Sequence, residues 1–172
     1  MTVDLPDATL EYHSITTLNK IRAGSPCKDG WEKLLKHLGK TAADDEPLSL
    51  LTVLGSNGLD DALWVLSYGA PECERLARHF QAWCAEQVLP IFEAERPADM
   101  RVREQIAMLR NDEANEEERD AAGAAARVAA LAAAGAAAGD AARDAAGAAA
   151  RDAARAAQEA AFRRMLSARR AA

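Results

Sequence analysis

The residues of this chain that most often bind metals or take part in catalysis are three histidines and three cysteines. His13, His37 and His79 are far apart, and none has a cysteine or a carboxylate three or four residues away. Zinc sites are usually built from such pairs, and no His-Glu-x-x-His or Cys-x-x-Cys motif occurs. The sequence therefore predicts no metal site and no cofactor.

Two of the cysteines, Cys73 and Cys84, fall on one face of a predicted helix. About three turns, or about 16 Å, separate them, which is too far for a disulfide bond. The odd number of cysteines, with no charged and apolar leader at the N-terminus, favours reduced thiols in the cytoplasm. The stretch "GSNGLDD" has the glycines of a phosphate-binding loop but lacks its lysine and its preceding strand. We therefore expect that the protein is not an enzyme.

Acidic residues occur in two groups, each close to a predicted helix start: Asp44, Asp45 and Glu46, and then Asp60 and Asp61. One interpretation is that their charge offsets the exposed N–H groups of a helix N-terminus. The other is that these carboxylates contact a basic partner.

The tryptophans Trp31 and Trp64 have a similar pair of interpretations, as core residues or as interface residues. Trp64 follows the second acidic group closely, so we include it in the predicted contact surface. The candidate partner-binding residues are Asp44, Asp45, Glu46, Asp60, Asp61 and Trp64.

The formal charge of -6 is unevenly distributed along the chain. Residues 1–40 carry a net charge of +1, residues 41–119 carry -10 and residues 120–172 carry +3. Because like charges repel, the acidic middle is not expected to bind nucleic acid directly, and it would suit a basic protein surface. We also expect no membrane-spanning segment, since the longest uncharged run of the alanine-rich region, Val128–Gly139, is too short.

Capping residues predict helices along most of the chain. Thr17 and Gly24 frame a short helix, and the next is expected to have Ser25 as its N-cap, Pro26 in its first position and Gly39 at its end. The apolar stripe of that second helix consists of Trp31, Leu34, Leu35 and Leu38.

Four further helices are predicted before the alanine-rich region. They run from Pro47 to Gly55, from "SNG" through Leu66, from Pro71 to about Phe92, and from Pro97 to Leu109. Within the third, Pro90 is expected to end or kink the helix. The N-terminal segment "TVDLPDATLEYHSI" alternates weakly and is interrupted by Pro6, so it predicts an irregular arm or a short edge strand.

The alanine-rich region begins with a predicted capping box, Asn115 with Glu118. From Asp120 the chain runs in tetrads that mostly have glycine or arginine in the fourth place. A helix turns about 100° per residue, so a period of four drifts about 40° per repeat and keeps no stripe on one side. We therefore expect two closely packed helices, broken near Gly135–Gly139, which would also offer a surface for a homodimer. The glycine spacing indicates either a helix contact or a low-complexity expansion.

These elements predict an all-α protein, a multi-helix bundle with an alanine-rich C-terminal helical pair and an irregular or β N-terminal arm. We expect a single domain over residues 1–172. Residues 1–24 would form the arm and a short helix, residues 25–110 the bundle, and residues 115–170 the alanine-rich part packed on it.

Three segments carry a resemblance to a known family: "SPCKDGWEKLLKHLGK" (Ser25–Lys40), "DDEPLSLLTVLGSNGLDDALWVL" (Asp44–Leu66) and "RDAARAAQEAAFRRML" (Arg151–Leu166). They resemble the blocks of a family of bacterial and prophage immunity proteins, which neutralise toxins of polymorphic toxin systems. The resemblance implies a non-catalytic inhibitor that occludes a toxin, with the acidic middle as the contact face.

Two other functions stay open. The first alternative is a phage-encoded anti-defence inhibitor, similar to an anti-CRISPR protein, that occludes a nucleic-acid-binding host effector. Its carboxylates would then stand in for phosphates. The second is an enzyme whose catalytic groups converge only in the fold.

Overall fold

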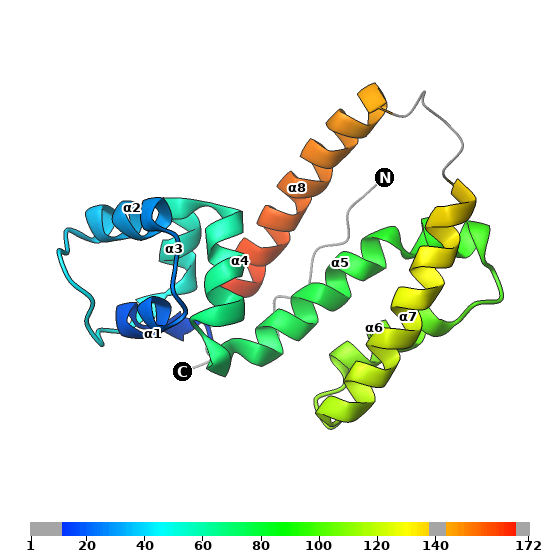
Figure 1. The fold of residues 1–172 in the computed structure, drawn as a ribbon, viewed down its shortest axis with the longest axis horizontal. Helices are drawn as coiled ribbons and strands as arrows, with labels where there is room; N and C mark the ends of the chain where they lie inside the picture. The colour runs from blue at the N-terminus through cyan, green and yellow to red at the C-terminus, as the bar shows by residue number, and fades with distance from the viewer. Residues whose placement is uncertain (1–11, 138–143, 168–172) are drawn as a thin grey trace. The chain divides into compact units, whose positions relative to one another are not determined.

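The computed structural model describes residues 12–137 and 144–167, with side chains described for residues 12–126 and 151–167. Regular structure in these ranges is almost entirely helical, so the predicted all-α class is confirmed (Figure 1). The elements in chain order are β1 (Ile15–Thr16), α1 (Leu18–Ala23), α2 (Lys28–Leu38), β2 (Leu48–Ser49), α3 (Leu50–Asn57), α4 (Leu59–Tyr68), the 3-10 helix η1 (Pro71–Cys73), α5 (Glu74–Glu95), α6 (Arg101–Arg110), α7 (Glu116–Ala137) and α8 (Asp144–Ser167).

The described residues form two compact units. The α1–α4 unit comprises residues 12–77 together with residues 159–167, the end of α8. The α5–α7 unit comprises residues 78–137 together with residues 144–158. A single domain over residues 1–172 stays a prediction, because a division by contacts does not define folding cooperativity.

In the α1–α4 unit, the segment ahead of α1 pairs with the segment ahead of α3. β1 and β2 are antiparallel, with Thr16 opposite Leu48. The Thr16 side chain is buried, and its hydroxyl donates a hydrogen bond to the carbonyl oxygen of Gly69. The end of the predicted arm is therefore a short strand, while residues 2–11 lie outside the described residues.

The start of α2 differs from the prediction. Ser25, expected as its N-cap, has a left-handed φ of 61°, and its N–H donates to the carbonyl oxygen of Arg22. Ser25 therefore closes α1 and cannot also open α2. Cys27 takes the N-cap position, where its Sγ accepts a hydrogen bond from the N–H of Gly30 at 3.4 Å. Consequently α2 begins at Lys28.

Gly39 ends α2 as predicted, but α3 does not end at the predicted Gly55. Gly39 has a φ of 65° and caps α2. Gly55, the predicted end of the next helix, lies inside α3, which continues to Asn57. The chain leaves α3 at Gly58, whose φ is 94°, a value that favours glycine.

The start of α3 also lies later than predicted. Pro47 was expected to open the helix, but Leu48 and Ser49 form β2 instead. Leu48 is buried there, and Ser49 caps α3 by accepting a hydrogen bond from the N–H of Leu51 at 3.1 Å. Strand pairing with β1 therefore displaced the helix start.

The core of the α1–α4 unit combines apolar side chains from α1, α3, α4 and the end of α8. Its main buried members are Leu18, Ile21, Leu50, Val53, Leu54, Leu59, Val65, Leu66, Phe162 and Met165. A Cβ on Gly69 would lie 3.0 Å from the Cα of Ile21. The end of α4 therefore approaches the backbone of α1 as closely as a glycine allows.

In the α5–α7 unit, α5 does not end at Pro90, contrary to one reading of that residue, and continues to Glu95. Pro90 is exposed and lies inside the helix, where it removes one backbone hydrogen bond without ending the helix. Arg78 ties α5 to the far end of α6 by donating to the Leu109 carbonyl oxygen at 2.9 Å and to Asp112 at 3.1 Å.

The beginning of α7 is the capping box that the sequence predicts. The N–H of Glu118 donates to the side chain of Asn115, and the N–H of Asn115 donates to the Glu118 carboxylate, both at 2.9 Å. Two N–H groups at the start of the helix are thereby satisfied. From there α7 packs against α6.

The alanine-rich region forms two helices, as predicted from the drift of its tetrads. The first, α7, is described to Ala137, and the second, α8, is described from Asp144. Gly135 lies inside α7, whereas Gly139 lies outside the described residues. Close packing of α7 against α8 stays a prediction. None of the described helices combines the length and the apolar character that crossing a membrane requires.

Candidate functional site

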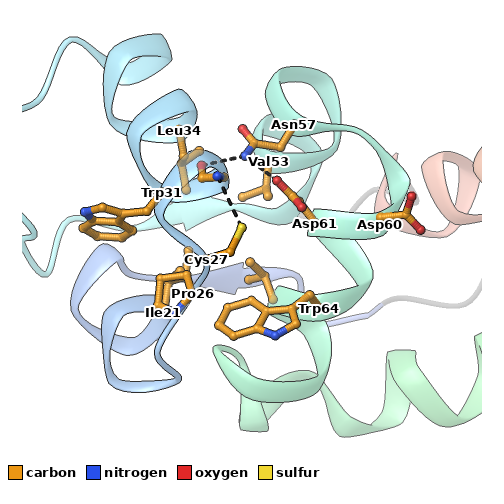
Figure 2. Close-up of a pocket in the computed structure, with 12 residues that line it drawn as sticks. Ile21, Pro26, Cys27, Trp31, Leu34, Val53, Asn57, Asp60, Asp61 and Trp64 are labelled. Atoms are coloured by element: carbon orange, nitrogen blue, oxygen red, sulfur yellow. Dashed lines mark hydrogen bonds between the residues drawn. The ribbon is translucent and has the colours of Figure 1, made fainter.

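A cavity of about 230 Å³ lies within the α1–α4 unit, between α1, α2, α3 and α4 (Figure 2). It is lined by Ile21, Pro26, Cys27, Gly30, Trp31, Leu34, Val53, Asn57, Asp60, Asp61, Trp64 and Val65. Most of these residues are apolar, and two are carboxylates. The lining includes no lysine, arginine or histidine.

Of the four α4 residues that line the cavity, three share one side of the helix because of their spacing. Asp61, Trp64 and Val65 are three and four residues apart, which places them on one side of a helix. Gly58, in its extended, positive-φ conformation, starts α4 directly after α3 and so sets the two helices side by side. A single helix, α4, therefore supplies the cavity with a carboxylate, an indole ring and an aliphatic side chain.

A hydrogen-bond network joins the start of α2 to the end of α3 and the start of α4. The Nδ2 of Asn57 donates to the carbonyl oxygen of Gly30 at 2.8 Å and to the Oδ2 of Asp61 at 2.7 Å. At the other end of this network, the Cys27 Sγ accepts from the Gly30 N–H. These contacts orient the Asp61 carboxylate toward α2.

Gly30 is the close-contact point of this network. A Cβ at this position would lie 2.8 Å from the Asp61 Oδ2 and 3.1 Å from the Cys27 Sγ. Figure 2 shows the Asp61 carboxylate turned toward Asn57, whereas the Asp60 carboxylate points the other way. The two neighbouring acids therefore have different surroundings.

Trp64 forms the aromatic wall of the cavity. Its ring centroid lies 5.4 Å from that of Tyr68, and a Cβ on Gly24 would lie 3.1 Å from the edge of the indole. Figure 2 shows the indole on the side of the cavity away from Asn57. These contacts hold the half-buried Trp64 ring in place without covering it.

Trp31 borders two hollows. Beside the acidic cavity, it lines a second one of about 260 Å³, together with Arg22, Ser25, Pro26 and Lys28. In Figure 2, Pro26 lies between Trp31 and Trp64. The basic side chains of this region thus belong to the other side of Trp31 and not to the lining of the acidic cavity.

The first predicted acidic group lies elsewhere, in the loop between α2 and β2. The Nζ of Lys40 lies 2.5 Å from the Asp44 Oδ2 and 2.6 Å from the Glu46 Oε2. These hydrogen bonds raise the pKa of Lys40, and the Lys40 ammonium lowers the pKa of Asp44. This group does not begin a helix, because α3 starts only at Leu50. Lys40 offsets part of its charge instead.

The six predicted contact residues are therefore divided. Asp60, Asp61 and Trp64 line the cavity, whereas Asp44, Asp45 and Glu46 do not. Sequence reasoning missed Cys27, Gly30 and Asn57. Asn57 ends α3 and Asp61 belongs to α4, so the spacing of these residues within "SNGLDD" is not that of neighbours on one helix and gave no signal of their contact.

The cysteines differ in their chemical environments. Cys27 is exposed and lines the cavity, whereas Cys73 is buried and Cys84 is half-buried. Burial raises the pKa of the Cys73 thiol to about 11 and that of Cys84 to about 11. Within the described residues, no group of three or more histidine, cysteine or acidic side chains is placed to hold a metal ion.

Comparisons of the chain with family models, with curated proteins and with solved structures found no match. The chemistry of the site is therefore inferred from its own geometry. Two carboxylates beside an apolar and aromatic wall suit a group that is both cationic and partly apolar.

Proposed function

We propose that this protein is a non-catalytic inhibitor of the immunity type, which binds a toxin in the cytoplasm and occludes it with the surface around the acidic cavity. The observation that carries this proposal is that Asp61 and Trp64 line one cavity, with Asp60 also among its lining residues. An inhibitor of this kind needs shape and charge complementarity rather than chemistry of its own.

The size of the cavity supports a protein partner over a small molecule. Pockets for small molecules usually measure about 300–1,000 Å³, and this one measures about 230 Å³. Protein interfaces commonly concentrate their binding energy in a few side chains that fill such pockets. A partner would therefore insert a single side chain here and cover the rim with its own surface.

The charge of the surrounding chain supports a basic partner. Residues 41–119 carry a net charge of -10, and such a field accelerates the association of an oppositely charged protein. Within this segment we assign the main contact with the partner to Asp60, Asp61 and Trp64, which line the cavity. Asp44 and Glu46 make a smaller contribution, because the Lys40 ammonium that they share already offsets part of their charge.

The test is neutralisation of a toxin in living cells. The chain is co-expressed with the product of the gene adjacent to its own, in a host where that product alone stops growth. We expect the wild-type chain to restore growth and the double variant Asp60→Asn, Asp61→Asn to restore it at least tenfold less. A matched control, Asp29→Asn with Glu32→Gln, removes two exposed carboxylates from α2 outside the cavity and should neutralise like the wild type.

The same experiment separates the alternative function. If the neighbouring product is harmless, and the chain instead restores phage growth in a host protected by a nucleic-acid-binding effector, the protein is an anti-defence inhibitor. Equal growth with the cavity variant and the matched control would place the contact surface outside the cavity.

A further inference from the structure

The acidic cavity has the features of a socket for one particular side chain. We propose that it takes an arginine side chain of the partner, with the guanidinium group at Asp61 and the aliphatic stem against Trp64 and Val65. This inference rests on the proposed function, because it names the part of the partner that the cavity binds.

The volume limits what can enter the cavity. An apolar cavity of about 150 Å³ in another protein accommodates a benzene molecule, and this cavity measures about 230 Å³. There is thus room for one flat group of that size with a short stem. A guanidinium group on its three-carbon stem has this shape.

The charge of the lining favours a cation. Asp61 is part of the wall, and the lining includes no lysine, arginine or histidine beside it. The Oδ2 of Asp61 accepts a hydrogen bond from Asn57, and a carboxylate offers about four acceptor sites in all. Asp61 is therefore held in position and retains acceptor capacity for a ligand.

The aromatic wall favours arginine over lysine. Guanidinium groups are planar and weakly hydrated, stack on aromatic faces and bind carboxylates through two parallel hydrogen bonds. Tryptophan is the strongest aromatic partner for a cation. Asp61 and Trp64 lie three residues apart on α4 and both line the cavity, so an arginine side chain can reach Asp61 with its guanidinium group while its stem lies along Trp64. The ammonium group of lysine is a compact, strongly hydrated charge and gains less from such a wall.

The experiment uses the full chain labelled with 5-fluorotryptophan. The chain has three tryptophans, so fluorine NMR gives three resonances, which are assigned with single Trp→Phe variants. Trp83 is 3 % exposed and does not line the cavity, so its resonance is the internal reference. The probes are four acetylated and amidated pentapeptides, Gly-Ser-X-Ser-Gly, in which X is arginine, citrulline, lysine or leucine.

We expect the arginine peptide to shift the Trp64 resonance saturably, while the Trp83 resonance stays in place. Citrulline has nearly the shape of arginine without its charge, so its peptide should bind at least tenfold more weakly, and the lysine peptide should fall between them. Asp61→Asn should weaken the binding of the arginine peptide about tenfold. Asp60→Asn should have a smaller effect, because its carboxylate points away from Asn57 and Asp61.

Three results would overturn the inference. Equal responses to arginine and citrulline would exclude recognition of charge, and a stronger response to leucine would identify the cavity as a purely apolar socket. An unmoved Trp64 resonance at saturating arginine peptide would exclude the site. Circular dichroism of each variant verifies that it is folded, and a Gly30→Ala variant, whose Cβ would press on Asp61, gives a second way to block the cavity.

Failure of this inference is distinguishable from failure of the proposed function. If the arginine peptide binds but no toxin is neutralised, the socket exists and the immunity function is wrong. If a toxin is neutralised while the peptide does not bind, the protein binds the toxin without taking up an arginine side chain in this cavity.

Discussion

The three thiols of the chain should react at very different rates. Burial raises the pKa of Cys73 and of Cys84 to about 11, so at pH 8 only about one molecule in a thousand carries either thiolate. Cys27 is exposed at the N-cap of α2. We expect one thiol to react rapidly with DTNB at pH 8 and the other two to react only after the protein unfolds, as measured by absorbance.

Cys27→Ser is the matched control for this experiment. It should abolish the rapid phase and keep the helix start, because serine is also a good N-cap residue. Two rapidly reacting thiols in the wild-type chain would contradict the described burial of Cys73 or Cys84.

Asp99 should ionise at unusually low pH. Its carboxylate accepts hydrogen bonds from the Arg101 guanidinium at 2.9 and 2.5 Å, and this holds the pKa of Asp99 at about 2. Because the pKa is lower in the folded chain than its ordinary value of 3.8, the stabilisation is present above that value and is lost as the pH falls toward 2.

The carboxyl carbon shift of Asp99, followed by NMR, checks this prediction. At pH 3 the group should still be about 90 % ionised in the wild-type chain. Arg101→Gln should move its midpoint back toward the ordinary value. A wild-type midpoint near that ordinary value would show that the ion pair does not form in solution.

At the scale of the elements, two glycines should respond oppositely to the same substitution. Gly55 lies inside α3 with open space around it, so Gly55→Ala should stabilise the protein by about 0.5–1 kcal/mol through helix propensity. At Gly69, an added Cβ would meet the backbone of Ile21 at 3.0 Å. Gly69→Ala should therefore destabilise it by about 1–3 kcal/mol.

Chemical denaturation of the two variants and the wild type measures both changes under one condition. A stabilising Gly69→Ala would mean that α1 does not approach the end of α4 as closely as described, and a destabilising Gly55→Ala would contradict the open space described around Gly55. The pair also separates the two roles of glycine in this chain, since only Gly69 is needed for the contact between elements.

For the whole molecule, association with the partner should be steered by charge. The acidic segment attracts a basic protein over a distance that salt shortens. We expect the association rate constant to fall about tenfold or more between low and high salt, while dissociation changes little. Surface plasmon resonance at several salt concentrations measures both rates.

Variants of the two acidic groups test which one does the steering. Asp60→Asn with Asp61→Asn should reduce both the rate and its salt dependence. Asp44→Asn with Asp45→Asn removes the same formal charge but should matter less, because Asp44 is paired with Lys40. The opposite order would move the interface to the loop between α2 and β2.

The sequence by itself determined the all-α class, the short helix after Thr17, the capping box of α7 and the division of the alanine-rich region into two helices. These features depend on interactions between residues close in the chain, namely side-chain caps, helix propensity and the angular drift of a four-residue repeat. From composition and charge, the sequence also singled out six candidate contact residues, of which Asp60, Asp61 and Trp64 line the cavity.

Only the tertiary structure decided where α2 and α3 begin and which acids share a site. At Pro47 a distant backbone contact overrode the local signal, because β2 forms where β1 offers a strand to pair with. At Ser25 a competing local contact did so, since its N–H closes α1 by donating to Arg22. Asn57 joins Gly30 to Asp61 across three helices, and no periodicity in the sequence encodes such a contact. The cavity exists because separate helices meet there, and that meeting is decided by packing rather than by local preference.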